Sequence, residues 1–230
     1  MHTGSLKLEG RRSQLLSTEL TQRFYDRTAP FYSLSTLLFH TRAHERLIEM
    51  AGPLNGRQVL EVAVGSGELF RQLMQRNPGG LTAGVDLSPA MVGLVKKRVH
   101  GASNGNGRWA GRFLLQAVDA RNMPFPDGMF DLLFNCYLFE LLTPSDIDRT
   151  VQEFRRVLRP GGRLLLVNIG NTGRFFNWIY GWLGYAVPSY WGRQVTPQVP
   201  AILERGGFRI ARSEVVTQTL YPSLVTLAER

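Results

Sequence analysis

The chain has 230 residues, of which 43% are hydrophobic, and a formal net charge of +9. This size allows one substantial core, so a single domain is expected, and one cysteine, Cys136, excludes an intrachain disulfide. Scattered histidines without ligand spacing predict no metal site. The charge is compatible with solvated helix faces or with attraction to an anionic membrane. Nucleic acid is the weakest explanation, because no long basic arm is visible.

The first residues, 1–12, mix Gly, Ser and charge without a period, and we expect a disordered tail before a domain over 13–230. Apolar side chains that recur every four residues predict a helix from residue 13. A second helix is expected over 41–51, so that 13–51 forms an N-terminal helical cap. No basic and then apolar signal segment opens the chain, which favours a cytoplasmic protein, with peripheral contact at the inner membrane face as the alternative.

A Gly-x-Gly turn follows an apolar run and precedes a helical pattern, which predicts strand, turn and helix. Gly65 and Gly67 permit positive φ and lack side chains, so a ligand can reach backbone N–H groups near a helix N-terminus. Such a turn alone also occurs in ordinary strand-to-helix connections. Asp86, at the end of the next apolar run, can accept hydrogen bonds from both ribose hydroxyls, and the pair predicts a nucleotide site. Phe70 stands where a dinucleotide site has a third small residue, which favours an adenosine ligand other than NAD.

The central part of the chain alternates strand and helix, which is typical of a doubly wound parallel sheet. Strands are expected at 57–63, 81–86, 112–118, 129–135, 162–169, 208–217 and 220–228. Helices are expected at 67–77, 88–100, 144–158 and 196–205, with a surface loop at 101–111. The last two strands are expected to pair as an antiparallel hairpin, which gives a sheet of seven strands.

Five motifs of the chain occur in the order found in a known enzyme family. They are Glu61 before the glycines, Gly84 to Met91, Asp119, Pro124 to Asp131, and Leu158 to Gly162. The chain resembles the class I S-adenosylmethionine-dependent methyltransferases, in particular the ubiquinone and menaquinone C-methyltransferase branch. The resemblance covers about residues 20–230 and implies a Rossmann-like α/β sheet with a C-terminal antiparallel hairpin. Ala63 departs from the family motif, which has its first glycine there, and we expect binding to survive.

This resemblance implies S-adenosyl-L-methionine as cofactor and S-adenosyl-L-homocysteine as product. The implied cofactor-binding residues are Glu61, Ala63, Gly65, Gly67, Asp86, Leu87, Met91, Asp119, Ala120 and Asn135. Of these, Asp119 is implied to bind the adenine amino group, although it can instead cap a helix or turn. Leu87 and Met91 are implied to sandwich the ring.

Methyl transfer from a sulfonium requires alignment more than a dedicated base. Where the acceptor must lose a proton, the candidates near the strand ends are Tyr25, Tyr32, His40, Tyr137 and Glu140, and no spacing singles one out. An aromatic insertion, 170–195, is too short and too broken by Gly and Pro to span a membrane. Related enzymes place acceptor lids here, which implies Phe175, Trp178, Trp182 and Tyr185 as substrate-binding residues. Membrane contact, core packing and a homodimer interface remain alternatives for this segment.

The sequence therefore predicts an S-adenosylmethionine-dependent methyltransferase that acts on a small hydrophobic acceptor, quinol-like or otherwise aromatic or lipid-like. One alternative is a phospholipid headgroup N-methyltransferase at a membrane surface, which the charge and the aromatic insertion favour. Another is a protein that binds S-adenosylmethionine without turnover, which Ala63 and the lack of an obvious base allow.

Overall fold

The computed structural model describes residues 41–101, 112–170, 195–218 and 222–230. The strands are β1 (Gln58–Val62), β2 (Leu81–Asp86), β3 (Arg112–Ala117), β4 (Phe130–Cys136), β5 (Leu158–Ile169), β6 (Arg209–Val216) and β7 (Ser223–Glu229). The helices are α3 (Thr41–Ala51), α4 (Glu68–Arg76), α5 (Pro89–Gly101), α6 (Pro144–Val157) and α9 (Val199–Arg205), with short 3-10 helices η1 (Phe139–Leu141) and η2 (Thr196–Gln198). The predicted tail, the helix from residue 13 and nearly all of the aromatic insertion lie outside these residues.

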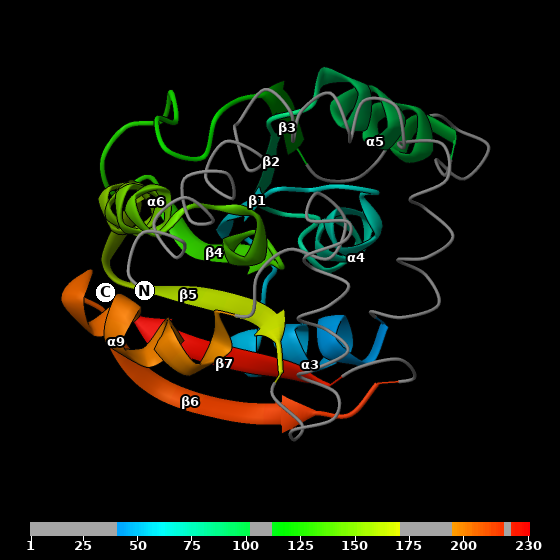
Figure 1. Ribbon diagram of the computed structural model, residues 1–230. Helices are drawn as coiled ribbons and strands as arrows, with labels where there is room; N and C mark the ends of the chain where they lie inside the picture. The colour runs from blue at the N-terminus through cyan, green and yellow to red at the C-terminus, as the bar shows by residue number, and fades with distance from the viewer. Residues whose placement is uncertain (1–40, 102–111, 171–194, 219–221) are drawn as a thin grey trace, which may run out of the picture.

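The described strands form one seven-stranded sheet in the order β3-β2-β1-β4-β5-β7-β6 (Figure 1). The first five strands of the chain are parallel, because a helix or a long connection returns the chain between them. Strand β7 lies between β5 and β6 and is antiparallel to both. The predicted α/β fold and its C-terminal hairpin are confirmed.

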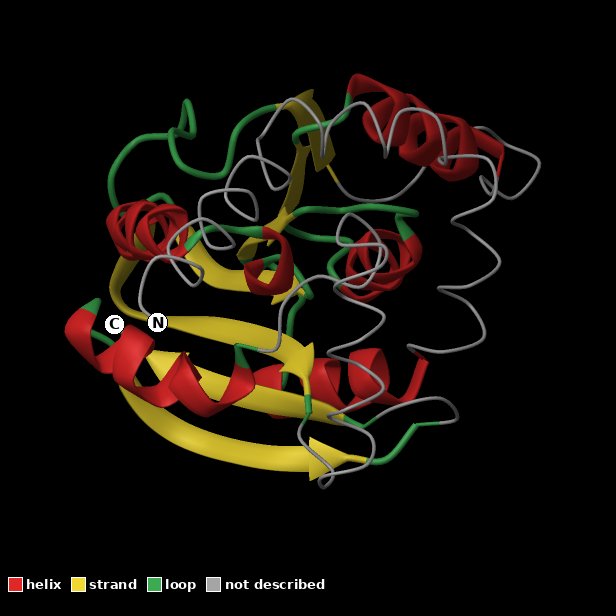
Figure 2. Cartoon of the chain, in the orientation of Figure 1, coloured by secondary structure: helices red, strands yellow, loops and turns green. Residues whose placement is uncertain are grey.

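Helices cover both faces of the sheet (Figure 2). Successive strand residues point to opposite faces, so Val59 joins a core under α3 and α4, while Leu60 joins a core under α6 and α9. A third apolar cluster fills the space between α4, α5 and β3. The carboxyl ends of β1 and β4 break this apolar pattern, since Glu61 and Asn135 are buried there.

Two helices begin with a side-chain cap, close to the predicted helix starts at 88 and 144. Ser88 Oγ accepts a hydrogen bond from the Met91 N–H at 3.1 Å, just before α5. Thr143 Oγ1 accepts one from the Asp146 N–H at 3.2 Å, before α6. Each bond satisfies a backbone donor that the first helical turn leaves without a partner.

The strand bounds differ from the prediction by one to three residues at most ends, and the largest difference is at the start of β5. Strand β5 begins at Leu158, not at 162, because Leu158 pairs with Phe130 of β4 before the register shifts. Gly161, with a φ of 73°, lies in this irregular part of the strand. The Arg-Pro-Gly-Gly stretch is therefore an irregular start of the strand instead of a separate turn.

Candidate functional site

The glycine turn between β1 and α4 requires glycine at its last position. Gly67 has a φ of 78°, and a Cβ added there would lie 2.7 Å from a methyl carbon of Val95 in α5. Gly65 also has a positive φ, of 49°. The turn therefore lies tightly against α5, with backbone N–H groups near the start of α4.

Asp86, at the end of β2, is bonded to this turn. Its Oδ2 accepts a hydrogen bond from the Gly65 N–H at 2.9 Å, and its Oδ1 accepts one from the Ser88 N–H at 2.9 Å. The structure thus brings together the two features that the sequence singled out. Each carboxylate oxygen can accept more than one hydrogen bond, so these contacts leave room for ribose hydroxyls.

Two buried polar side chains at the ends of β1 and β4 have an atom without a hydrogen-bond partner among the described residues: Oε2 of Glu61 and Oδ1 of Asn135. Glu61 is 3% exposed, and burial, followed by the charges of Asp86 and Glu68, raises the pKa of its carboxyl well above the usual value. Asn135 donates from Nδ2 to the Val62 carbonyl at 2.9 Å. Buried polar atoms are rarely left unpaired, so these two atoms are compatible with the predicted cofactor site, and their role there stays a prediction.

The third position of the glycine motif is filled by an aromatic ring. Phe70 is fully buried, and a Cβ added at Gly84 of β2 would lie 2.7 Å from its Cε2 atom. The side chain thus occupies the space between α4 and β2 that a dinucleotide motif keeps small. The exclusion of NAD stays a prediction, and this packing supports it.

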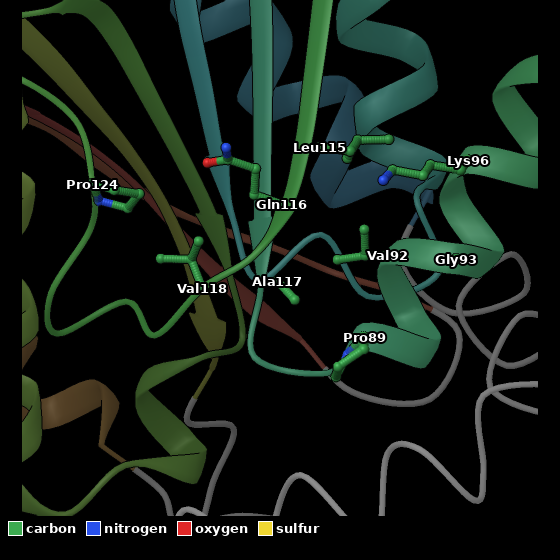
Figure 3. A pocket seen from close by; sticks show the side chains of 9 residues that line it. All are labelled: Pro89, Val92, Gly93, Lys96, Leu115, Gln116, Ala117, Val118 and Pro124. Carbon is green, nitrogen blue, oxygen red and sulfur yellow. The ribbon is translucent and has the colours of Figure 1, made fainter.

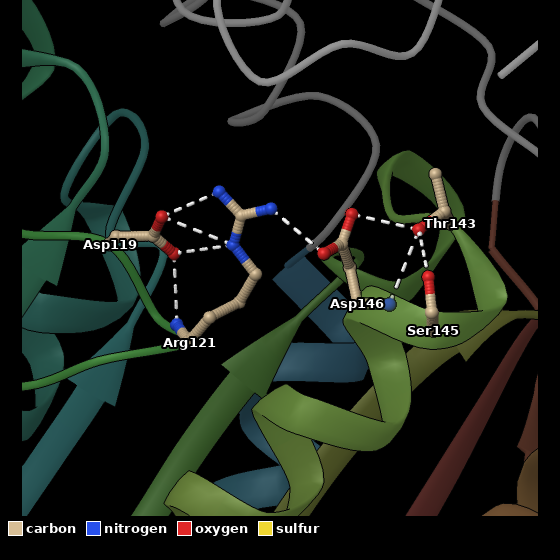
Figure 4. A network of polar contacts seen from close by, with 5 residues as sticks. All are labelled: Asp119, Arg121, Thr143, Ser145 and Asp146. Carbon is tan, nitrogen blue, oxygen red and sulfur yellow. Dashed lines mark hydrogen bonds and ion pairs between the residues drawn. The ribbon is translucent and has the colours of Figure 1, made fainter.

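Asp119, predicted to bind adenine, is held by Arg121 in the loop after β3 (Figure 4). Its oxygens accept hydrogen bonds from the Arg121 Nε at 2.9 and 3.1 Å, from Nη2 at 2.6 Å and from the Arg121 N–H at 2.9 Å. Burial raises the pKa of Asp119, but the bonds and charge of Arg121 outweigh it, so the pKa lies below its usual value. The turn-capping role that the sequence left open is therefore present, beside the role toward adenine that stays a prediction.

Arg121 also joins this loop to α6. Its Nη1 donates to Asp146 Oδ1 at 2.8 Å, and Thr143 Oγ1 donates to Asp146 Oδ2 at 2.8 Å (Figure 4). This bridge could not be predicted from the sequence, because Arg121 and Asp146 are far apart in the chain.

The remaining cofactor residues lie near the same strand ends. Leu87 and Ala120 are half-buried, whereas Met91 is fully buried in the first turn of α5. Arg98, which was not predicted to take part in the site, donates from Nη1 to the Ser66 carbonyl at 2.7 Å. It thereby supports the glycine turn from α5.

Tyr137, a candidate base, follows β4 with a φ of 58°. Its hydroxyl lies 2.7 Å from Ser223 Oγ and accepts a hydrogen bond from Gln218 Nε2 at 3.1 Å. Burial raises the pKa of this phenol far above its usual value, so the group stays protonated. The structure thus makes Tyr137 a packing and hydrogen-bonding group.

Glu140, the other described candidate, is buried in η1, and burial raises its pKa to about 7. Burial raises the pKa of the Cys136 thiol as well, which fits a small buried side chain. The remaining predicted residues lie outside the described part of the chain: Tyr25, Tyr32, His40, Phe175, Trp178, Trp182 and Tyr185.

An open pocket of about 550 Å³ lies between α5 and the end of β3 (Figure 3). It is lined by Pro89, Val92, Gly93, Lys96, Leu115, Gln116, Ala117, Val118 and Pro124. None of the predicted cofactor residues lines it, although Val118 directly precedes Asp119 in the chain. The pocket therefore borders the predicted site, and two of its lining residues, Pro89 and Pro124, belong to the five motifs.

Comparisons with known proteins show similarity to methyltransferases. A family described as "Methyltransferase domain" matches residues 60–166. The demethylmenaquinone methyltransferase of Thermotoga maritima is 32% identical over 164 residues, or 69% of this chain and 66% of that protein. The ubiquinone/menaquinone biosynthesis C-methyltransferase of Geotalea daltonii is 34% identical over 122 residues, or 53% of this chain and 48% of that protein. The chain thus spans two thirds or less of the length of these curated relatives.

Solved structures share the fold. The [4+2]-cyclase SpnF has a TM-score of 0.71 at 18% identity, covering 93% of this chain and 96% of that chain. The magnesium protoporphyrin IX methyltransferase of Synechocystis PCC 6803, with bound S-adenosylhomocysteine, has a TM-score of 0.65 at 20% identity, covering 83% of each chain. Along the described stretches, no helix is long and apolar enough to cross a membrane. Sequence relatives and strand order both point to the class I S-adenosylmethionine-dependent methyltransferases, which this chain resembles in sequence and in fold.

Proposed function

We propose that this protein transfers a methyl group from S-adenosylmethionine to a ring carbon of a quinol-type acceptor. Cofactor binding is supported chiefly by the hydrogen bond between Gly65 and Asp86. This bond joins the glycine turn to the carboxylate that is expected to bind the ribose. The acceptor class rests on the relatives named as demethylmenaquinone and ubiquinone/menaquinone C-methyltransferases.

The residues present fit the cofactor. Glu61 and Asn135 offer buried polar atoms that lack a partner in the described chain, and Asp86 offers a fixed carboxylate. The bound cofactor supplies an electrophilic methyl group on a sulfonium. The protein has to hold the acceptor in line with that group and keep water out, because alignment lowers most of the barrier of such a displacement.

A protein that binds the cofactor without methyl transfer is the second candidate. This second candidate is retained because the [4+2]-cyclase SpnF, whose name is not that of a methyltransferase, shares the fold across nearly the whole chain. A fold does not fix the reaction, which depends on the residues of the site. The two candidates differ in one outcome, the appearance of a methylated product.

Radiolabelled S-adenosylmethionine, incubated anaerobically with the protein and demethylmenaquinol, tests the proposal. We expect label in a product whose mass exceeds that of the acceptor by one methylene, with the methyl on the ring. Phosphatidylethanolamine vesicles in a parallel reaction test headgroup N-methylation. Label in the phospholipid alone would contradict the quinol proposal, and cofactor binding without label in either acceptor would favour the second candidate.

A further inference from the structure

A buried polar pair lies at the carboxyl ends of β4 and β5. Glu140 is 2% exposed, and Asn168 of β5 is fully buried. Glu140 Oε1 accepts hydrogen bonds from the Ile169 N–H at 2.8 Å and from Asn168 Nδ2 at 3.1 Å. Glu140 Oε2 and Asn168 Oδ1 have no partner among the described residues. One carboxyl oxygen is therefore fixed by two hydrogen bonds, whereas the other is buried without a hydrogen-bond partner among the described residues.

The backbone after β4 turns sharply to place this carboxyl. Tyr137 takes a left-handed conformation, and its N–H donates to the Val167 carbonyl of β5 at 2.8 Å. The 3-10 helix η1 follows at once and carries Glu140 to the end of β5. Such strained positions in non-glycine residues cluster at functional sites.

The pair lies close to the residues assigned to the cofactor. Burial is the main cause that raises the pKa of the Cys136 thiol, and the charges of Glu61 and Glu140 raise it further. Both carboxyls are therefore within electrostatic range of this thiol. Asn135 is in register with Leu166, and Asn168 follows two positions later on β5. Because side chains alternate along a strand, Asn135 and Asn168 belong to the same sheet face.

The unpartnered atoms are all hydrogen-bond acceptors. Ionised Glu140 offers a hydrogen-bond acceptor at Oε2, and the amide oxygen of Asn168 is an acceptor as well. A ligand that satisfies them must bring donors. A quinol offers hydroxyl donors beside the ring carbon to be methylated, whereas a quinone or an ether offers none.

We propose that Glu140 accepts the proton of an acceptor hydroxyl, and that Asn168 holds the Glu140 carboxyl in position for this transfer. The inference rests on the proposed function, because it assigns the acceptor side of the same site. In the step, the O–H bond of the acceptor breaks and its electron pair stays on oxygen, while an O–H bond forms at Glu140 Oε2. The oxyanion enriches the neighbouring ring carbon in electrons, and no oxidation occurs. Glu140 later releases the proton to solvent.

The ionisation of Glu140 suits this role near neutral pH. Burial raises its pKa to about 7, while the bonds from Ile169 and Asn168 limit the rise. Cys136 and Tyr137 also interact with its charge, and both have a raised pKa, so they stay neutral as Glu140 titrates. A base with a pKa near the working pH is the most effective in such a transfer.

Binding of 1,4-dihydroxynaphthalene to the protein saturated with S-adenosylhomocysteine tests the proposal without turnover. Anaerobic calorimetry compares the wild type with Glu140→Gln, and 1,4-dimethoxynaphthalene serves as the probe that lacks donors. We expect Glu140→Gln to weaken diol binding at pH 8 at least tenfold, with unchanged affinity for the dimethoxy compound and for S-adenosylhomocysteine. In the wild type, diol affinity should rise as pH increases through about 7, and this rise should vanish in the variant.

Glu204→Gln, at an exposed position of α9, is the matched control and should match the wild type. If Glu140→Gln does not fold, Asn168→Ala replaces it, with an expected loss of diol affinity of at least threefold. Equal losses for the two naphthalenes, unchanged diol binding in the variant, or no diol binding by the wild type would each overturn the proposal. The methyl-transfer assay judges the proposed function separately, because this test needs no transfer.

Discussion

Ala63 adopts a left-handed conformation, with a φ of 61°, where the family motif has its first glycine. For a residue with a Cβ atom, this conformation costs about 1–2 kcal/mol. We therefore expect Ala63→Gly to raise the free energy of unfolding by about 1 kcal/mol, since the greater freedom of glycine in the unfolded chain offsets part of the gain. Equilibrium urea unfolding measures the change.

Ala90→Gly in α5 is the control for this exchange. A glycine inside a helix should lower the free energy of unfolding by about 1 kcal/mol. A loss of stability in Ala63→Gly similar to that in Ala90→Gly would show that the turn does not strain Ala63.

How far single residues could be predicted depends on where their partners lie. Gly65 and Asp86 were found from the sequence because each stands at a strand end with a local signal. The ion pair that holds Asp119 could not be predicted, because Arg121 is also bonded to Asp146, and this bridge forms only when α6 is packed. Likewise, the position of the Glu140 carboxyl depends on a hydrogen bond to its Oε1 from Asn168, which β5 brings from a distant part of the chain.

The start of helix α6 could be predicted directly from the sequence. Thr143 caps its first turn, accepting a hydrogen bond from the Asp146 N–H at 3.2 Å, and Pro144 occupies the first helical position. We expect Thr143→Ala to lower the free energy of unfolding by about 1 kcal/mol, because a backbone donor loses its partner. Thermal or urea unfolding measures this loss.

Thr143→Ser keeps the hydroxyl and should retain most of the stability. An alanine variant as stable as the wild type would contradict the capping role.

The start of β5 could not be predicted from the sequence in the same way. Its first pair, Leu158 with Phe130, joins segments far apart in the chain and is set by a register shift.

For the whole molecule, the positive charge is partly structural. Arg156 donates to the carbonyls of Phe125 and Met123 at 2.7 and 2.9 Å, and Arg163 donates to the Ala51 carbonyl at 2.9 Å. Arg156 thus connects α6 to the loop before β4, and Arg163 connects β5 to the end of α3. The solvated-surface explanation therefore applies to exposed residues such as Lys96 and Lys97, and not to every basic group. Attraction to an anionic membrane stays a proposal.

Stability should depend on pH through Glu140. Burial raises its pKa from 4.5 to about 7 in the folded protein, so the folded state binds a proton that the unfolded state has lost. Its contribution is complete below pH 4.5 and is lost as pH rises through about 7, a change of roughly 3 kcal/mol. The free energy of unfolding of the wild type, relative to Glu140→Gln, should fall by this amount between acidic and alkaline pH.

Urea unfolding of both proteins at several pH values measures this difference. Comparing the two removes the opposite contribution of Asp119 and Asp146, whose pKa values are lowered in the folded protein. A difference that does not change with pH would show that Glu140 keeps an ordinary pKa.

Calorimetric titration with S-adenosylhomocysteine tests most directly whether the glycine turn and Asp86 form the cofactor site. Asp86→Ala should weaken binding by roughly 2–4 kcal/mol, about 30- to 1,000-fold, because the ribose loses a charged acceptor and Gly65 loses its bond. Asp148→Ala, at an exposed site on α6, is the control and should bind like the wild type. Tight binding by the wild type and the control with a large loss in Asp86→Ala is the predicted result. Equal affinity in all three proteins, or no binding by the wild type, would contradict the account.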